Sequence, residues 1–176
     1  MLENKLIHKH LGVTLQHDGR WNSHLVDLIS KTRLLVSCLK SYKHRLTRKS
    51  LEIIYTSFIL PHFHYGDILY DNCPLYYKDK LEDINLDALR TIIGTVRGTS
   101  HLKIYTEAGF SSLSERRKKH KFTMYFKILN GLTPTFLTNY LPPLASSLNP
   151  YHRRRPLERQ HPLAQNFTKI SYQSRT

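Results

Sequence analysis

The residues best able to do chemistry lie near the end of the run Leu46–Tyr70, where Tyr65-Gly66-Asp67 places a carboxylate after a glycine. Two-metal phosphoryl-transfer chemistry uses such carboxylates in pairs, to hold two ions roughly 4 Å apart. Ile68 follows Asp67 instead, and no two aspartates are adjacent anywhere in the chain. The sequence therefore predicts that Asp67 and Asp71 share an exposed helix face, four residues apart, without a catalytic role.

Three other patterns could support catalysis or ligand binding, and each lacks a necessary element. His62 and His64 do not have the four-residue spacing that brings two histidines on a helix to one metal, so we predict solvated surface residues. The segment 94–100 has glycines like a phosphate loop, but no lysine precedes its hydroxyl pair, so a plain turn is predicted. The eleven histidines and two cysteines lie in no nucleophile motif. We predict no catalytic residue, no bound metal and no cofactor.

Positive charge is the strongest functional signal. The 176 residues include 27 Lys and Arg against 13 Asp and Glu, a formal net charge of +14. The runs 40–49 and 116–121 contain no acidic residue, and rings lie within or beside them, as at Tyr42, His120 and Tyr125. Cations displace counterions from phosphates and rings stack on bases, so we predict a nucleic-acid partner: RNA, DNA or a hybrid duplex. The predicted phosphate-binding residues are Lys40, Lys43, Arg45, Arg48, Lys49, Arg116, Arg117, Lys118, Lys119, Lys121, Arg153, Arg154 and Arg155.

Length and composition limit the class of protein. A chain of this length suits one domain and a tail. Cys38 and Cys73 do not have the spacing of a zinc site, and two thiols make no disulfide scaffold, which favours a reducing compartment. No apolar run reaches the roughly 18 residues of a membrane span, and residues 1–10 are too polar for a signal peptide. We therefore expect an intracellular protein, nuclear or cytoplasmic, without a membrane partner.

Several elements must position these residues, beginning with a short β element. Residues 6–15 are rich in β-branched types and partly alternate, which predicts a strand, and Asp18-Gly19 supplies a turn. Apolar residues then recur every three or four positions, which predicts an amphipathic helix over residues 23–40 with Asn22 or Ser23 as its cap.

Thr47 is predicted to cap a central helix. Its expected inward stripe is wide enough to contact neighbours on more than one side, and it contains Leu51, Ile54, Tyr55, Phe58 and Ile59, widened by Ile53 and Leu60. Pro61 lacks an N–H and crowds the carbonyl four residues earlier, so we expect it to kink or divide the helix. The run 62–70 is predicted to continue as a second helical piece.

Further helices are predicted over residues 76–93 and 101–108, and from Ser112 to Asn130, with a short piece at 135–141. Gly94 is a natural helix stop, and the spacing of Ser112 and Glu115 is that of a capping box. On the helix over 76–93, the acidic side chains Glu82, Asp83 and Asp87 are predicted to form a solvated outer face with local pairs such as Asp87 with Arg90.

These elements predict a mainly α protein, a multi-helix bundle with a short N-terminal β-hairpin. We divide it into a hairpin at residues 1–22, a helical domain at 23–141, and a tail at 142–176. The tail is rich in Pro and Arg, which predicts an extended, disordered segment.

The ordered set of segments resembles the region after the catalytic box in non-LTR, LINE-type (jockey-like) retrotransposon reverse transcriptases. The matching pieces are His10-Leu11-Gly12-Val13-Thr14-Leu15, Trp21, His24, Lys49-Ser50-Leu51, Tyr55, Leu60-Pro61, Tyr65-Gly66, Lys80-Leu81-Glu82, Ala88-Leu89-Arg90-Thr91-Ile92-Ile93-Gly94, Leu113, Glu115-Arg116-Arg117, Tyr125-Phe126-Lys127-Ile128-Leu129-Asn130-Gly131-Leu132 and Pro134. They span about residues 6–145, and no single piece is specific by itself.

The resemblance implies a part of an RNA-directed DNA polymerase. His10-Leu11-Gly12-Val13 is similar to the hairpin that seats the primer end, with His10 where the family usually has Tyr or Phe. The helices are similar to the thumb and the linker beyond it, which hold the template–primer through its backbone. The catalytic aspartates would lie in a palm domain outside this chain, with which it could associate. We therefore expect no polymerase activity from this chain alone.

Two alternatives remain from the residues themselves. A helical protein–protein interaction module would expose an apolar patch where a palm would pack, involving Leu6, Ile7, Leu11 and Val13. A sequence-reading helix-turn-helix is disfavoured, because the connector 41–46 is longer than the usual three or four residues.

Overall fold

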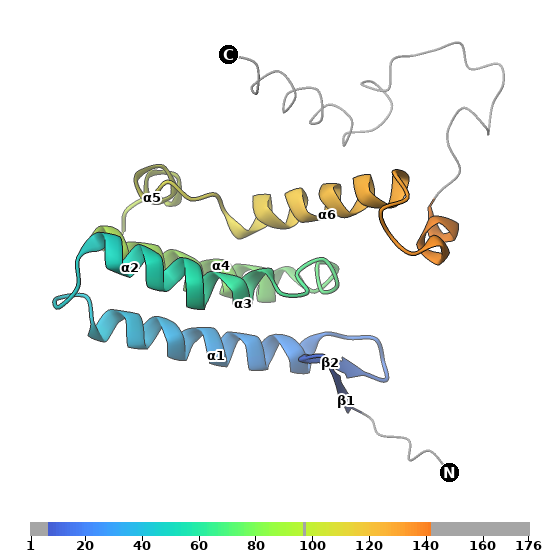
Figure 1. Ribbon diagram of the computed structural model, residues 1–176. Helices are drawn as coiled ribbons and strands as arrows, with labels where there is room; N and C mark the ends of the chain where they lie inside the picture. Colours follow the sequence, from blue (N-terminus) through green and yellow to red (C-terminus); the bar gives the residue numbers. More distant parts are fainter. Residues whose placement is uncertain (1–6, 97, 142–176) are drawn as a thin grey trace, which may run out of the picture. The chain divides into compact units, whose positions relative to one another are not determined.

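The computed structural model describes residues 7–96 and 98–141, in which a short β-hairpin precedes a set of helices (Figure 1). The mainly α fold with an antiparallel N-terminal hairpin is therefore confirmed. The predicted tail at 142–176, with Arg153, Arg154 and Arg155, and the predicted patch residue Leu6 lie outside the described residues. Two compact units divide the chain after Phe126, and each is described by itself.

The hairpin consists of β1 (Ile7–His10) and β2 (Val13–Gln16). They pair antiparallel, with His10 opposite Val13, so only Leu11 and Gly12 form the turn. The single strand expected over residues 6–15 is thus broken in the middle. Both turn residues have positive φ, 47° and 82°, as a two-residue turn of the I′ type requires.

Helix α1 (Asn22–Ser41) confirms the helix predicted over residues 23–40. Its cap is not the one predicted, because Trp21 stands at the N-cap and offers no side-chain hydrogen bond. The side chain of Gln16, from the hairpin, accepts a hydrogen bond from Ser23 N at 3.2 Å instead. The preceding strand therefore satisfies a free amide of the first turn.

Pro61 changes the helix before it without dividing it. Helix α2 (Arg48–Ile54) continues through a π-helical turn, η1 (Tyr55–Ile59), into α3 (Leu60–His64). Leu60 N bonds to Tyr55 O, five residues back. The wider turn gives the proline ring room at the carbonyl it would crowd in an α-helix.

The second helical piece predicted over residues 62–70 is wrong beyond His64. Tyr65 has extended backbone and Gly66 has a φ of 69°, so the chain leaves the helix there and runs through a series of turns, residues 65–72. We call this segment the post-α3 turn.

The wide inward stripe predicted for the central helix is narrower in the structure. Leu51, Tyr55, Ile59 and Phe63 are buried at a spacing of four, whereas Phe58 is 64% exposed. One side of α2–α3 therefore faces solvent, and this helix is not the centre of the fold.

Helix α4 (Leu75–Ile93) is the central element, because it packs against α1, α2 and α5. The buried residues of α4 are spread over several sides of the helix and do not form one stripe. They are Leu81, Ile84, Asn85, Leu86, Ala88, Leu89, Thr91 and Ile92. Gly94 ends the helix in the left-handed conformation, as predicted.

Two further helices follow, and the second of them continues past Phe126. Helix α5 (His101–Ala108) ends at Gly109, which has a φ of 69°. Helix α6 (Leu113–Leu129) begins after Ser112, whose Oγ accepts a hydrogen bond from Glu115 N at 3.2 Å. The predicted end of α5 and the predicted start of α6 are confirmed, and α6 ends one residue before the predicted Asn130. The second unit contains the 3-10 helix η2 (Thr135–Tyr140).

A chain of buried and half-buried hydrogen bonds joins the helices around α4. Tyr55 donates its hydroxyl to Asn85 Oδ1 at 2.6 Å, and Asn85 Nδ2 donates to the hydroxyl of Tyr105 at 3.2 Å. Tyr105 in turn donates to Glu82, which also accepts from Leu113 N at 3.2 Å. Burial raises the pKa of both tyrosines above the ordinary value, so the phenols remain protonated donors. The network ties α2, α4, α5 and the start of α6 together.

We predict that Tyr55→Phe lowers the free energy of unfolding by about 1–3 kcal/mol, because it leaves the Asn85 oxygen without a donor inside the core. Urea unfolding followed by circular dichroism measures the change. Tyr42→Phe is the matched control, since Tyr42 is 50% exposed, and its effect should stay within about 0.5 kcal/mol. Equal unfolding midpoints for the two variants would contradict the role of this network.

Candidate nucleic-acid interface

The predicted cations of the described chain form two separate groups. The connector cluster contains Lys40, Lys43, Arg45, Arg48 and Lys49, and the α6 cluster contains Arg116, Arg117, Lys118, Lys119 and Lys121. Arg48 begins the α2–α3 helix, whereas the ring of His64, at its other end, lies 4.9 Å from the ring of His120, which stands between Lys119 and Lys121 on α6. That helix is roughly 24 Å long at 1.5 Å per residue. The connector cluster therefore adjoins the start of this helix, whereas α6 contacts its end.

Local caps explain why the connector cluster is exposed. Thr47 has extended backbone and its hydroxyl accepts a hydrogen bond from Ser50 N, as predicted for the cap of α2. Helix α1 ends at Ser41, so the residues between the helices form a turn on the surface.

Two members of the connector cluster are already paired. Lys40 forms an ion pair with Asp87 of α4. Arg48 contacts Glu52 at 3.0 Å and donates to the carbonyl oxygen of Glu107 at 2.8 Å.

Lys43, Arg45 and Lys49 have no side-chain ion pair or hydrogen bond within residues 7–96 and 98–141. Arg45 and Lys49 are exposed and Lys43 is half-buried. These three cations are the part of the connector cluster that remains free to meet phosphate.

The α6 cluster is held on one side by Asp71 of the post-α3 turn. Arg117 is buried, 7% exposed, and its Nε donates to Asp71 at 3.2 Å. Lys121 also donates to Asp71, and Lys78 lies 3.7 Å from it. The expectation that Arg117 contacts phosphate is therefore corrected, because its guanidinium faces the interior and is occupied.

The rest of the α6 cluster faces outward or packs locally. Arg116 donates to Ser111 O at 3.2 Å and lies over the ring of Phe110. Lys118 and Lys119 are exposed, and neither has a side-chain partner in the described part of the chain.

The exposed helix face predicted for Asp67 and Asp71 is wrong. Asp67 is 3% exposed and its carboxylate lies 2.6 Å from Nδ1 of His120. Gly66 ends the helical geometry, and the turn directs both carboxylates toward α6. The sequence did contain a signal for this pairing. Asp67 and Asp71 are two carboxylates close together, and α6 has several cations but no carboxylate after Glu115 to pair with them.

His64 is not the solvated residue predicted. It is half-buried, and its Nε2 has no hydrogen-bond partner. Burial, followed by the charges of Arg116 and His120, lowers the pKa of His64, so the neutral form is favoured. His62 is also half-buried, and burial with the charge of Lys31 lowers its pKa.

The acidic face predicted on α4 also has different partners. Glu82 is half-buried and serves the core network rather than solvent. Asp87 pairs with Lys40 and not with Arg90. The partners lie on other helices, which local spacing does not reveal.

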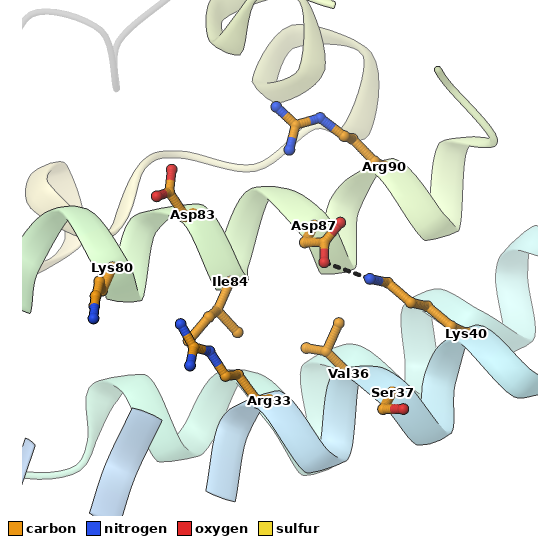
Figure 2. Close-up of a pocket in the computed structure, with 9 residues that line it drawn as sticks. All are labelled: Arg33, Val36, Ser37, Lys40, Lys80, Asp83, Ile84, Asp87 and Arg90. Atoms are coloured by element: carbon orange, nitrogen blue, oxygen red, sulfur yellow. Dashed lines mark hydrogen bonds and ion pairs between the residues drawn. The ribbon is translucent and has the colours of Figure 1, made fainter. Parts of the chain in front are cut away.

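A cleft of about 510 Å³ lies between α1 and α4 (Figure 2). Its wall contains both signs of charge, and its lining is Arg33, Val36, Ser37, Lys40, Lys80, Asp83, Ile84, Asp87 and Arg90. The ion pair between Lys40 and Asp87 spans the two helices, and Asp83 adds a carboxylate that would repel phosphate. We assign no ligand to this cleft.

The hairpin expected to seat a primer end lies against the post-α3 turn. Tyr65 donates its hydroxyl to the carbonyl oxygen of Leu11, and a Cβ at Gly12 would lie 3.6 Å from the Tyr65 ring. Leu11 is 77% exposed and His10 is exposed, whereas Val13 is buried. An L-residue with φ near 47° is strained, so this contact holds a leucine in an unfavourable conformation at the tip.

No protein-family model, curated protein or solved structure matches this chain. Within the described residues, no three His, Cys, Asp or Glu side chains are arranged to hold a metal ion. No helix in the same residues has both the length and the apolar character needed to span a membrane. A function must therefore be inferred from the residues of the chain itself.

We predict that Leu11→Asn stabilises the hairpin by about 1 kcal/mol, because asparagine tolerates the left-handed conformation. Amide hydrogen exchange at His10 and Val13 measures the change as slower exchange. Leu15→Asn, in the middle of β2, is the control and should speed exchange, since it places a poor strand former in the sheet. Faster exchange in Leu11→Asn would contradict the strain argument.

We predict a pH-dependent contribution from Asp71. Burial alone would raise its pKa, but the hydrogen bond and charge of Lys121, with Lys78 and Arg117, lower it below the ordinary value. A carboxylate with a lowered folded pKa stabilises the fold above its unfolded pKa, and this contribution is lost as the pH falls below about 4. Asp71→Asn should cost about 3 kcal/mol at pH 7, because it leaves Arg117 unpaired.

Denaturant unfolding at pH 7 and pH 3 tests this prediction. The difference between wild type and Asp71→Asn should shrink at pH 3, where the wild-type carboxylate becomes protonated. Asp79→Asn makes the same change of charge at an exposed position and should differ little from wild type at either pH. An equal difference at both pH values would show that Asp71 acts by packing alone.

Proposed function

We propose that this chain is the thumb and post-thumb segment of a non-LTR, LINE-type reverse transcriptase, and that it holds nucleic acid through the phosphate backbone without reading sequence. In this proposal the catalytic aspartates belong to a palm domain outside this chain. The observation that carries the proposal is the set of cations left without a carboxylate, namely Lys43, Arg45, Lys49, Lys118 and Lys119.

The contrast within the connector cluster supports a polyanionic partner. The fold neutralises Lys40 and Arg48 with carboxylates from α4 and α2. It leaves three cations of the same cluster without such partners in the described chain, although like charges close together repel. A phosphate backbone would relieve that repulsion and release counterions.

The location of these cations supports backbone contact rather than base readout. Lys43 and Arg45 lie in a turn and Lys49 in the first turn of α2. Flexible cations in a turn position a nucleic acid, whereas base readout uses a helix or ribbon inserted in a groove. Arg48 lies at the start of the α2–α3 helix and His120 of α6 lies against His64 near its end, and this helix of roughly 24 Å has the length of about seven base pairs of duplex.

The carboxylates of the post-α3 turn support a non-catalytic role for this chain. Asp67 is buried against His120, and Asp71 forms ion pairs with Arg117 and Lys121. Two-metal catalysis needs neighbouring carboxylates that are free to hold ions. Here both are occupied by cationic or imidazole groups of α6.

The second candidate is a helical protein–protein interaction module derived from the same element. Exposed apolar side chains on the hairpin favour it, since Ile7 is 51% and Leu11 is 77% exposed. Tyr65, which is 54% exposed, extends this surface beside the tip of the hairpin. A palm domain is one partner that such a surface would fit.

We predict a steep salt dependence for binding of the full chain to a 20-base-pair RNA–DNA hybrid. If the five unpaired cations each contact a phosphate, log K falls against log salt with a slope of about −4.5. The triple variant Lys43→Gln, Arg45→Gln, Lys49→Gln should reduce the slope to about −2. Fluorescence anisotropy between 50 and 200 mM salt, concentrations at which such contacts dominate, measures both values.

The control removes the same charge elsewhere, with Lys31→Gln, Arg33→Gln and Lys103→Gln, and should leave the slope near that of wild type. An equal effect of the two triple variants would show that only the overall charge matters. An affinity that hardly changes with salt would exclude the proposed function. Absence of binding together with self-association in sedimentation would favour the interaction module.

A further inference from the structure

The outer face of α6 combines cations and aromatic rings. We infer that this face binds single-stranded nucleic acid by stacking bases on Tyr125 while Lys118 and Lys119 meet the phosphates. The inference rests on the proposed function and narrows it, because it assigns one of the two clusters to unpaired strands.

The contacts with the post-α3 turn determine which face of α6 is outward. Leu113 and Arg117 are buried, and His120 and Lys121 reach the carboxylates of that turn. These positions share one side of a helix with 3.6 residues per turn.

The rest of the helix surface carries the residues of the inferred site, and Tyr125 lies on the flank next to Lys121, one turn further along. Lys118 and Tyr125 are seven positions apart, almost two turns, so they project in nearly the same direction. Lys119 and Phe126, also seven apart, lie beside them. Tyr125 is 42% exposed and Phe126 is 52% exposed.

Tyr125 is available for a ligand in the first unit of the chain. No hydrogen bond or ring contact holds its side chain among residues 7–96 and 98–126. A large ring left partly in water forgoes part of the stabilisation that full burial would give. An aromatic surface beside lysines is the composition of a stacking site for bases.

Charge complementarity favours a polyanion on this face over an apolar protein. No Asp or Glu occurs between Arg116 and the end of α6 at Leu129. Lys118 and Lys119 are both exposed next to the rings. A partner must therefore supply negative charge and flat apolar groups together, as nucleotides do.

The chemistry further selects single strands. In a duplex the faces of the bases are covered by their neighbours, so a tyrosine ring has no base to stack on. In a single strand each base has an exposed face, and stacking on an aromatic side chain contributes about 1–3 kcal/mol per base. The lysines would serve either ligand, whereas Tyr125 would serve only the single strand.

The test compares labelled dT20 with a 20-base-pair DNA duplex, using the full chain and fluorescence anisotropy at one salt concentration. Tyr125→Leu keeps apolar volume and removes the ring, so it should weaken dT20 binding about 5- to 100-fold. Duplex binding should change less than about 2-fold. Tyr125→Trp should restore dT20 affinity, since it returns an aromatic face. Phe58→Leu, which removes a ring 64% exposed on η1, is the control and should change neither.

The outcomes separate this inference from the proposed function. If Lys118→Gln with Lys119→Gln weakens both ligands while Tyr125→Leu changes neither, backbone binding stands and the stacking site is excluded. If Tyr125→Leu weakens both ligands equally, the ring supports the fold of α6 and the inference is likewise overturned. If the wild-type chain binds neither ligand at 50 mM salt, the proposed function fails and the inference fails with it.

Discussion

The pairing of two carboxylates in the post-α3 turn with cations of α6 decides how that helix is oriented. Asp71 is contacted by Arg117 and Lys121, and Asp67 by His120. Because Arg117 is buried, rotating α6 would leave a charged group without a partner inside the protein, at a cost of several kcal/mol. The helix is therefore fixed with one side inward, and Lys118, Lys119 and Tyr125 remain exposed.

The same interaction explains why the two basic runs are not equivalent. In both runs, some cations form ion pairs within the protein. Asp87 and Glu52 pair with cations of the connector cluster, and Asp71 pairs with cations of the α6 cluster. Charge counted along the sequence therefore overstates the charge that a partner meets. The connector cluster keeps two free cations in a turn and one in the first turn of α2, whereas the α6 cluster keeps lysines on the same helix as Tyr125. We propose that the connector cluster contacts the phosphate backbone of a nucleic acid and that the α6 cluster contacts its bases as well.

Helix α4 connects the helices that carry the two basic clusters, through hydrogen bonds in the core. Its polar residues Asn85 and Glu82 join tyrosines from η1 and α5, and Glu82 also accepts from the first residue of α6. A buried network of this kind is stable only when every member has a partner, so it specifies one arrangement of the helices. The π-helical turn before Pro61 contributes to this arrangement because it contains Tyr55, the first donor of the network.

The sequence by itself determined the elements whose cause is local. Gly94 and Gly109 end helices since they adopt left-handed backbone without a Cβ, and Thr47 and Ser112 start helices through hydroxyls that accept a hydrogen bond from an amide three residues on. The helices and the basic runs follow from such short-range patterns, whereas the hairpin turns at Leu11-Gly12, inside the single strand predicted over residues 6–15. Only the tertiary structure decided that α4 is central, that Phe58 is exposed, and that Asp67 and Arg117 are buried. The partners of these two residues lie 53 and 46 positions away, so no local spacing indicates them, and burial of a charge depends on finding that distant partner.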